Sequence, residues 1–184
     1  MRTTLSSKRF AVSAVAAALL SAWITSAQPA SASQDSTAVP CSAPEYRQFD
    51  FWIGDWEVRN PKGVFVGTNL VERRFGDCVI QEHWKGKLGL EGSSFNVYDP
   101  SDKKWHQTWV DSQGTLLQLS GGLEGGKMVL SGELPSSGRP GKRASQRITW
   151  EKLRDGRVRQ LWESSEDDGK SWSLVFDGMY GKKE

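Results

Sequence analysis

Short alternating runs of strand-forming residues, each ended by a tight-turn sequence, fill almost all of the chain after about residue 44. No stretch of useful length shows the apolar spacing of an amphipathic helix. The turns are rich in Gly, Asp, Asn and Pro, which supply a positive φ or a side chain that bonds its own backbone. They lie at Asn60–Gly63, Asp99–Asp102, Ser112–Gly114, Glu124–Gly126, Asp155–Gly156 and Asp167–Gly169. The pattern predicts an all-β domain of consecutive hairpins.

These turns divide the domain into about ten strands of ordinary length. We expect the strands at Ile53–Arg59, Val64–Arg74, Cys78–Gly86, Ser93–Asp99, Trp105–Asp111, Thr115–Gly121, Lys127–Leu134, Ser145–Leu153, Arg157–Ser164 and Ser171–Tyr180. Consecutive hairpins form a meander, and closing the meander into a barrel removes its exposed edges. The expected fold is therefore a single antiparallel up-and-down barrel over residues 44–181, lipocalin-like, with a short helical or irregular segment leading into it.

The first 32 residues have the features of a signal peptide. Three basic residues are followed by an apolar, Ala-rich stretch at Phe10–Ile24, and Ala30–Ala32 offers small residues for cleavage. The apolar stretch is too short to be a stable membrane anchor, and a short uncleaved tethering helix is the less favoured alternative. We therefore expect an exported protein, periplasmic or secreted, with a signal peptide at 1–32 and a linker at 33–43.

Removing this segment leaves a chain of nearly balanced charge. The sequence has 24 Lys and Arg against 22 Asp and Glu, and the first 32 residues contain three of the basic and none of the acidic residues. The remaining domain lacks the electrostatic footprint that binding to nucleic acid or to an anionic membrane requires. We expect no nucleic-acid partner and no stable membrane anchor.

Cys41 and Cys78 are the two cysteines, and an even number in an exported chain favours a disulfide. The bridge would tie the segment that leads into the barrel to an early strand. By restricting the unfolded chain it would contribute about 3 kcal/mol. No histidine or lysine cluster adjoins either cysteine to lower a thiol pKa, so a pair of free thiols, one of them reactive, is the less favoured alternative.

Alternation within each strand separates an inner face from an outer face. In Cys78–Gly86 the inner set is Ile80, Glu82 and Trp84, because the opposite set is more polar. For the remaining strands the same test assigns these residues to the interior: Trp52, Trp56 and Val58; Trp105, Gln107, Trp109 and Asp111; Leu117 and Leu119; Met128 and Leu130; Ile148 and Trp150; Val158, Gln160 and Trp162; Trp172, Leu174, Phe176 and Tyr180. All eight tryptophans beyond the signal segment are thus expected inside.

Aromatic walls interrupted by amides and one acid suggest a lined cavity, since filled barrels are usually packed with branched aliphatic residues. A core filled by indole rings is the alternative. An unpaired buried carboxylate costs several kcal/mol, so Glu82 has to be paired, hydrogen-bonded or protonated. It belongs either to a satisfied core network or to a ligand site. The residues expected to bind a ligand are Trp84, Glu82, Gln107, Trp109, Trp150, Gln160, Trp162 and Phe176.

Signals for metal binding or nucleophilic catalysis are weak. His83 and His106 have outward parity, which disfavours a haem or metal site inside the barrel. The sequence has no Gly-x-Ser-x-Gly elbow and no Gly-rich phosphate loop. We expect no metal and no cofactor, and Glu82 is the catalytic candidate if the protein is an enzyme. Ser165–Trp172 matches the Asp-box hairpin turn, which predicts that Trp172 packs beneath that turn.

The opening segment Phe49–Val58 resembles that of lipocalins and related calycins, because it contains Gly54-x-Trp56 on the first expected strand of the domain. More closely, this opening and four further motifs resemble an uncharacterised family of exported bacterial proteins with a lipocalin-like barrel. Those motifs are Gln81–Trp84, Trp105–Asp111, Arg147–Trp150 and Arg159–Glu163. The resemblance extends over nearly all of Cys41 to Gly181 and implies a fold, but no substrate or activity.

The likeness to calycins also implies structural roles for Gly54 and Trp56. Trp56 would close one end of the barrel under the leading segment Pro44–Phe51. An arginine from a late strand would stack on its ring, a contact worth about 0.5–2 kcal/mol. Arg159 and Arg147 are the candidates for this partner, although both have outward parity.

Three functions are compatible with these features. The first and preferred one is a binding module that holds a small, largely apolar or amphipathic molecule between the tryptophan walls. The second is an isomerase, cyclase or hydrolase that uses Glu82 as a general acid or base, with its pKa raised by burial. The third is a filled barrel that acts through its outer face on a protein or envelope partner.

Overall fold

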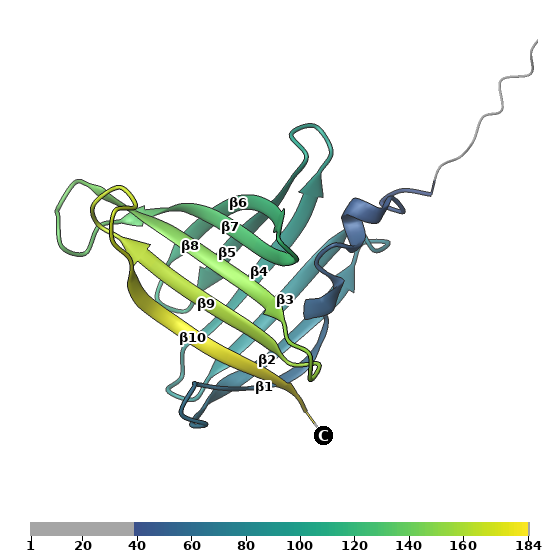
Figure 1. The fold of residues 1–184 in the computed structure, drawn as a ribbon, viewed down its shortest axis with the longest axis horizontal. Helices are drawn as coiled ribbons and strands as arrows, with labels where there is room; N and C mark the ends of the chain where they lie inside the picture. Colours follow the sequence, from purple (N-terminus) through teal and green to yellow (C-terminus); the bar gives the residue numbers. More distant parts are fainter. Residues whose placement is uncertain (1–38, 184) are drawn as a thin grey trace, which may run out of the picture. The chain divides into compact units, whose positions relative to one another are not determined.

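Ten antiparallel strands close into a barrel in the computed structural model, and each strand pairs with its neighbours along the chain (Figure 1). The strands are β1 (Gly54–Arg59), β2 (Phe65–Arg74), β3 (Val79–Gly86), β4 (Glu91–Asp99), β5 (Lys104–Asp111), β6 (Leu116–Glu124), β7 (Lys127–Pro135), β8 (Arg143–Lys152), β9 (Val158–Ser165) and β10 (Ser173–Lys182). Two short 3-10 helices precede them, η1 (Pro44–Arg47) and η2 (Asp50–Trp52). The structure describes residues 39–183, so the expected signal peptide at 1–32 and most of the linker at 33–43 lie outside it.

The predicted fold class is confirmed, and every expected strand is present with ends that differ by at most three residues. The largest difference is in β6, which continues to Glu124 instead of ending at Gly121. The reason is a two-residue turn at Gly125 and Gly126, both with positive φ, which lets the flanking strands pair up to the turn itself. Local turn chemistry thus sets the strand boundaries.

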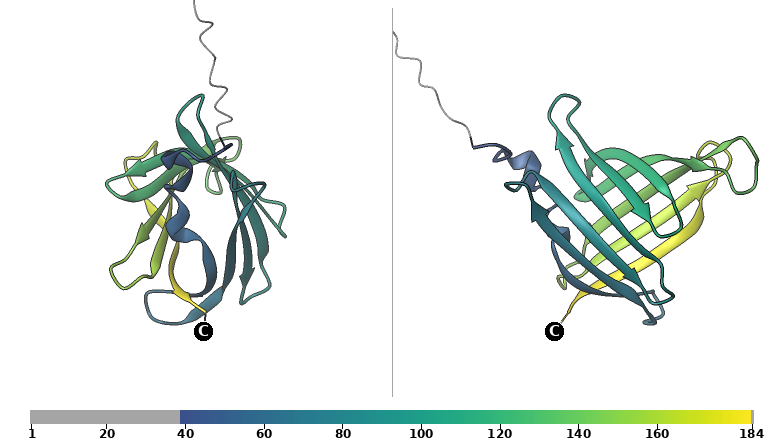
Figure 2. Two further views of the ribbon diagram at one scale, coloured as in Figure 1. Left: turned by 90° about the vertical axis from the view of Figure 1, so that its right-hand side faces the viewer. Right: turned by 180° about the vertical axis from the view of Figure 1, so that it is seen from behind.

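Closure of the barrel depends on pairing between the first and the last strand. In the register between β1 and β10, Trp56 lies opposite Lys182 and Val58 opposite Tyr180. Two further views show the strands wrapping around a common interior (Figure 2). Because β1 also pairs with β2, no strand of the sheet keeps a free edge.

The segment of residues 44–52, which we call the plug, fills one end of the barrel. Phe49 stacks on Trp52 with ring centroids 4.9 Å apart, and its ring meets those of Trp105 and Trp150 edge-on at 5.7 Å and 5.1 Å. All four rings are buried. The expected short helical lead-in is therefore present. No helix in residues 39–183 has the length and apolar character needed to cross a membrane.

A disulfide and polar contacts hold the plug against the adjoining strands. The predicted bridge between Cys41 and Cys78 is confirmed, and it links the residues before η1 to the start of β3. Arg47 of η1 donates a 2.8 Å hydrogen bond to the main-chain oxygen of Cys41. Asp50 of η2 forms an ion pair with Arg73 of β2. The plug is thus fixed at this end by one covalent bond and by charged side chains.

The inward assignment of Leu174 is wrong. The pairing between β10 and β9 shifts between Leu174 and Phe176, so that Phe176 lies opposite Trp162. This irregularity adds one residue, Val175, and reverses the parity on its N-terminal side. Leu174 consequently points outward and is 65 % exposed, whereas Phe176 and Tyr180 keep the predicted inward orientation.

The inward assignment of Trp172 is also wrong, although its expected position at the turn is confirmed. Asp167 accepts hydrogen bonds from the hydroxyl and the backbone N–H of Ser171, and Trp172 donates from Nε1 to the main-chain oxygen of Gly169. The indole ring then lies on the outer face, 4.1 Å from Cζ of Arg147. Trp172 precedes β10, so strand alternation does not control its direction.

Trp56 packs beneath the plug as predicted, but its cationic partner is a lysine. Nε1 of Trp56 donates a 2.8 Å hydrogen bond to the main-chain oxygen of Trp52. Nζ of Lys182 lies 3.9 Å from the Trp56 ring centroid. The expected stacking of an arginine is wrong, because Arg159 faces outward and forms a two-bonded ion pair with Asp177 at 2.7 Å and 2.9 Å. Lys182 reaches the Trp56 ring because it has the same inward parity on β10 as Phe176 and Tyr180.

Gly54 makes room for this lysine. A Cβ atom added to Gly54 would lie 2.0 Å from Nζ of Lys182. The Gly-x-Trp pair on β1 therefore has a physical explanation: the glycine leaves the space in which the ammonium group reaches the face of Trp56.

Candidate functional site

An internal cavity of about 260 Å³ lies in the barrel on the side away from the plug. Its lining residues come from β3, β5, β6, β8, β9 and β10 and from the turn before β4: Glu82, Trp84, Leu90, Gln107, Trp109, Leu117, Ile148, Gln160, Trp162, Val175, Phe176 and Tyr180. Seven of the eight residues expected to bind a ligand are brought together here. Trp150 is the exception, because its ring packs against the plug. The loops at 136–142 and 166–172 lie at this end of the barrel, opposite η1 and η2 (Figure 1).

Four aromatic rings surround the outer part of the cavity. Trp84 and Phe176 meet edge-on with centroids 5.8 Å apart. Trp109 donates from Nε1 to the carboxylate of Asp111 at the rim, as the inward parity of Asp111 suggested. Trp162 donates from Nε1 to Gln146 at 2.8 Å. We call Trp84, Trp109, Trp162 and Phe176 the aromatic mouth, and its half-buried rings leave apolar surface facing the cavity.

Glycines on the strands beside the mouth let two of these rings approach the neighbouring strand closely. A Cβ atom added to Gly92 would lie 2.3 Å from the ring of Trp109, and one added to Gly67 would lie 2.8 Å from Trp84. Both glycines belong to strands adjacent to the ring that covers them. Glycine in a strand interior weakens the sheet unless something approaches closely, and here it is an indole ring that does so.

Glu82 lies deeper in the cavity and is 4 % exposed. Its Oε1 accepts a 2.7 Å hydrogen bond from Nδ2 of Asn69, and its Oε2 accepts a 2.7 Å bond from the hydroxyl of Ser94. Burial raises the pKa of Glu82 from 4.5 to about 7, and these two hydrogen bonds only partly oppose the effect. The carboxyl group therefore changes between its protonated and its ionised form near neutral pH.

A chain of amides continues from Glu82 and fixes the orientation of Gln107. Asn96 donates from Nδ2 to the main-chain oxygen of Ile80 at 3.1 Å, which directs its Oδ1 toward Gln107. Gln107 in turn donates from Nε2 to that Oδ1 at 2.8 Å. Its Oε1 accepts no hydrogen bond from a described residue. Gln107 thus presents a free acceptor on the cavity wall.

Gln160 and Tyr180 form a second polar pair on the cavity wall. The hydroxyl of Tyr180 donates to Oε1 of Gln160. Burial raises the pKa of Tyr180 well above its ordinary value, and the neighbouring Glu82 adds to the shift. Tyr180 is therefore a neutral hydrogen-bond donor. No described residue accepts from Nε2 of Gln160, so this amide offers a free donor to the cavity.

Three polar residues of this network were missed in the sequence. Asn69, Ser94 and Asn96 are buried on the inner faces of β2 and β4. Ser94 lies directly opposite Glu82, and Asn96 opposite Gln107. Alternation carried through these two strands would have placed them inside, but their partners depend on the register between strands.

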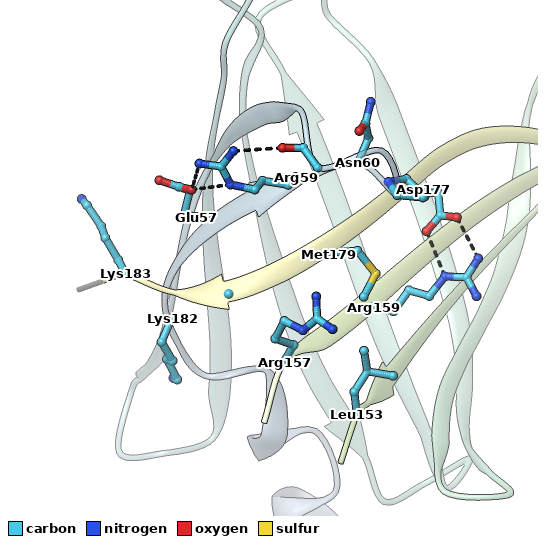
Figure 3. A pocket seen from close by; sticks show the side chains of 13 residues that line it. Glu57, Arg59, Asn60, Leu153, Arg157, Arg159, Asp177, Met179, Lys182 and Lys183 are labelled. Atoms are coloured by element: carbon cyan, nitrogen blue, oxygen red, sulfur yellow. Dashed lines mark hydrogen bonds and ion pairs between the residues drawn. The ribbon is translucent and has the colours of Figure 1, made fainter. Parts of the chain in front are cut away.

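A larger groove of about 910 Å³ lies on the outer face of β1, β9 and β10 (Figure 3). Most of its charged side chains are already paired, as Figure 3 shows for Arg59 with Glu57 and for Arg159 with Asp177, and Lys182 is held by the Ile53 carbonyl and the Trp56 ring. Exposed ion pairs of this kind contribute little and leave no unsatisfied group to recognise a ligand. We therefore assign the candidate site to the smaller internal cavity.

One group of side chains in residues 39–183 has the geometry to hold a metal ion, namely Asp99, Asp102 and His106. It lies on the outer surface around the turn between β4 and β5, since His106 has the predicted outward parity. Asp99 and Asp102 each accept a hydrogen bond from the backbone of this turn, and Nε2 of His106 lies 2.9 Å from Asp102. These three side chains therefore lie close together because they stabilise the turn between β4 and β5.

Comparisons with known proteins identify no family for this chain. No protein-family model matches the sequence, and no curated protein matches it. The chemistry of the cavity is thus the basis on which a function is proposed below.

Proposed function

We propose that the chain is an exported container that holds a small, largely apolar molecule inside its barrel. The observation that carries this proposal is a cavity of about 260 Å³ in a barrel whose other end is filled by the plug. At about 30 Å³ per water molecule, this space corresponds to roughly nine waters, which suits a small ligand. The disulfide between Cys41 and Cys78 supports export, because such bonds persist in oxidising compartments.

The lining supports a ligand with one polar end. The aromatic mouth offers apolar contact, and the deeper wall offers a free acceptor on Gln107, a free donor on Gln160 and the carboxyl group of Glu82. Binding sites for small molecules combine a mostly apolar lining with a few placed polar groups in this way. The cavity also favours a container over a filled barrel that acts only through its outer face.

A pair of substitutions on one strand tests the proposal. Leu117 lines the cavity, whereas its neighbour Leu116 is 56 % exposed on the outer face. Leu117→Trp should fill the cavity and abolish ligand retention, and Leu116→Trp should leave it intact. Retention is measured by native mass spectrometry of the protein purified under mild conditions. Ligand-dependent quenching of tryptophan fluorescence gives a second readout. Equal retention by both variants, or no bound molecule in the unsubstituted protein, would reject the container.

An enzyme in the same cavity is the second candidate, and the pKa of Glu82 supports it. A general acid or base works best when its pKa lies near the operating pH, and burial brings Glu82 to about 7. Under this alternative, Glu82→Gln would abolish turnover of a retained compound while its binding persists. Under the container proposal, the same variant changes affinity and no chemical conversion is detected in either protein.

A further inference from the structure

We infer that the ligand of the proposed container is a small organic cation, whose ammonium group pairs with Glu82 and whose apolar body lies within the aromatic mouth. This deepens the proposed function and depends on it. Three features of the cavity carry the inference: a carboxylate without a counter-charge, a ring of aromatic side chains, and an excess of free acceptors beside that carboxylate.

Among the described residues, Glu82 has no charged partner inside the barrel. The groups that face it are neutral: Asn69 from β2, Ser94 from β4 and Tyr180 from β10. No Lys, Arg or His within residues 39–183 lines the cavity. A buried carboxylate without a counter-charge is expensive, and it is retained where something pairs with it. A cationic ligand would supply the missing charge.

The aromatic mouth suits the same kind of ligand. The faces of indole and phenyl rings carry negative potential, and cations bind over them, most strongly over tryptophan. Trp84, Trp109 and Trp162 provide three indoles, with Phe176 as a fourth ring. An anionic ligand would be repelled both by these faces and by Glu82. A neutral ligand would gain only from burial of its apolar surface.

The hydrogen-bonding groups around Glu82 also match an ammonium group, which has three donors and no acceptor. Glu82 accepts one bond on each oxygen from the protein, and an ionised carboxylate has about four acceptor sites. Oε1 of Gln107 is a further free acceptor on the same wall. The donor hydrogens of an ammonium group would therefore find partners without disturbing the existing network.

Three probes of similar size and different charge test the inference: 2-phenylethylamine, which is protonated at neutral pH, 2-phenylethanol and phenylacetate. Affinities for the full-length protein are measured by calorimetry or by tryptophan fluorescence. At about pH 8 the amine should bind at least about tenfold more tightly than the alcohol, since hydrogen bonds to charged groups are the stronger ones. Phenylacetate should bind most weakly. The advantage of the amine should shrink toward about pH 5, because Glu82 is then protonated.

Two variants locate the effect. Glu82→Gln should remove the advantage of the amine while leaving the affinity for the alcohol. Glu72→Gln removes a carboxylate from the outer side of β2, where it pairs with Arg74, and should leave the advantage intact. Equal binding of amine and alcohol by the unsubstituted protein would overturn the cation inference and leave the container in place. Failure of all three probes to bind would overturn both.

Discussion

Asn69 donates a 2.7 Å hydrogen bond from Nδ2 to Oε1 of Glu82, while its own Oδ1 is buried without a partner among the described residues. A protonated Glu82 would relieve this imbalance, because its hydroxyl could donate to Oδ1 once the amide of Asn69 turns over. These contacts thus fit a neutral Glu82 carboxyl group, consistent with the effect of burial on its pKa.

The first prediction concerns stability against pH. The pKa of Glu82 is raised in the folded protein, so its contribution is fully present below about 4.5 and is lost as pH rises through about 7. The full loss is about 3 kcal/mol. Glutamine does not ionise, so Glu82→Gln should not lose this free energy of unfolding as pH rises. The stability of the variant minus that of the unsubstituted protein should therefore increase by up to that amount between about pH 5 and pH 8. Urea unfolding at both pH values measures the difference, and a constant difference would contradict the raised pKa.

The second prediction concerns the contact between Lys182 and Trp56. Lys182→Met keeps most of the side-chain length and removes the cation, so it should lower the free energy of unfolding by about 1 kcal/mol. Gly54→Ala should displace the same ammonium group, and it should therefore cost less in the Lys182→Met background than alone. Lys183→Met is the control. Lys183 is exposed, and its ion pair with Asp55 is long, at 3.7 Å, so its loss should change the stability little. Strict additivity of the two substitutions would show that Gly54 does not act through Lys182.

The third prediction concerns the disulfide. The bridge joins residues 37 positions apart, so replacing Cys41 and Cys78 by alanine should lower the free energy of unfolding by about 3–4 kcal/mol. A reductant should lower the stability of the unsubstituted protein to a similar level and have no effect on the double variant. Unfolding in guanidinium chloride with and without reductant measures both. A reductant that left the unsubstituted protein unchanged would contradict this role for the bridge.

The fourth prediction separates two tryptophans that are close in sequence. Trp162 lines the cavity, and Trp172 lies on the outer face against Arg147. Trp162→Leu should weaken the binding of 2-phenylethanol by about tenfold through lost aromatic contact. Trp172→Leu should leave that affinity unchanged, which titration calorimetry of both variants can check. A larger loss in Trp172→Leu than in Trp162→Leu would argue against the cavity as the binding site.

Most of the fold could be predicted because each hairpin turn has a recognisable local sequence. Turn sequences such as Glu124–Gly126 and Asp155–Gly156 carry their own conformational preferences, and alternation between them sets the faces of each strand. The inward positions of Glu82, Gln107 and Gln160 followed from this alone. The inward assignment of Leu174 was wrong because the irregularity in β10 inserts a residue, and nothing in the local sequence marks that insertion. The inward assignment of Trp172 was wrong because this residue precedes β10, where strand alternation does not apply.

The site was predicted less completely than the fold, because its polar network depends on which residues lie across from each other. Ser94 and Asn96 matter through their register with Glu82 and Gln107, and register becomes visible only when the strands are paired. The prediction of an arginine as the partner of Trp56 was also wrong. The resemblance to calycins points to an arginine of a late strand, whereas parity at the end of β10 brings Lys182 to the ring.

Pairing of β1 with β10 has a consequence for how the chain matures. The two strands are at opposite ends of the domain sequence, so the barrel cannot be completed until the last residues of β10 have emerged from the machinery that makes or translocates the chain. Contacts so distant along the chain also form slowly. Until then β1 and the newest strand both carry unsatisfied backbone groups, which can pair with those of another molecule. A chain truncated before Ser173 would keep that hazard permanently.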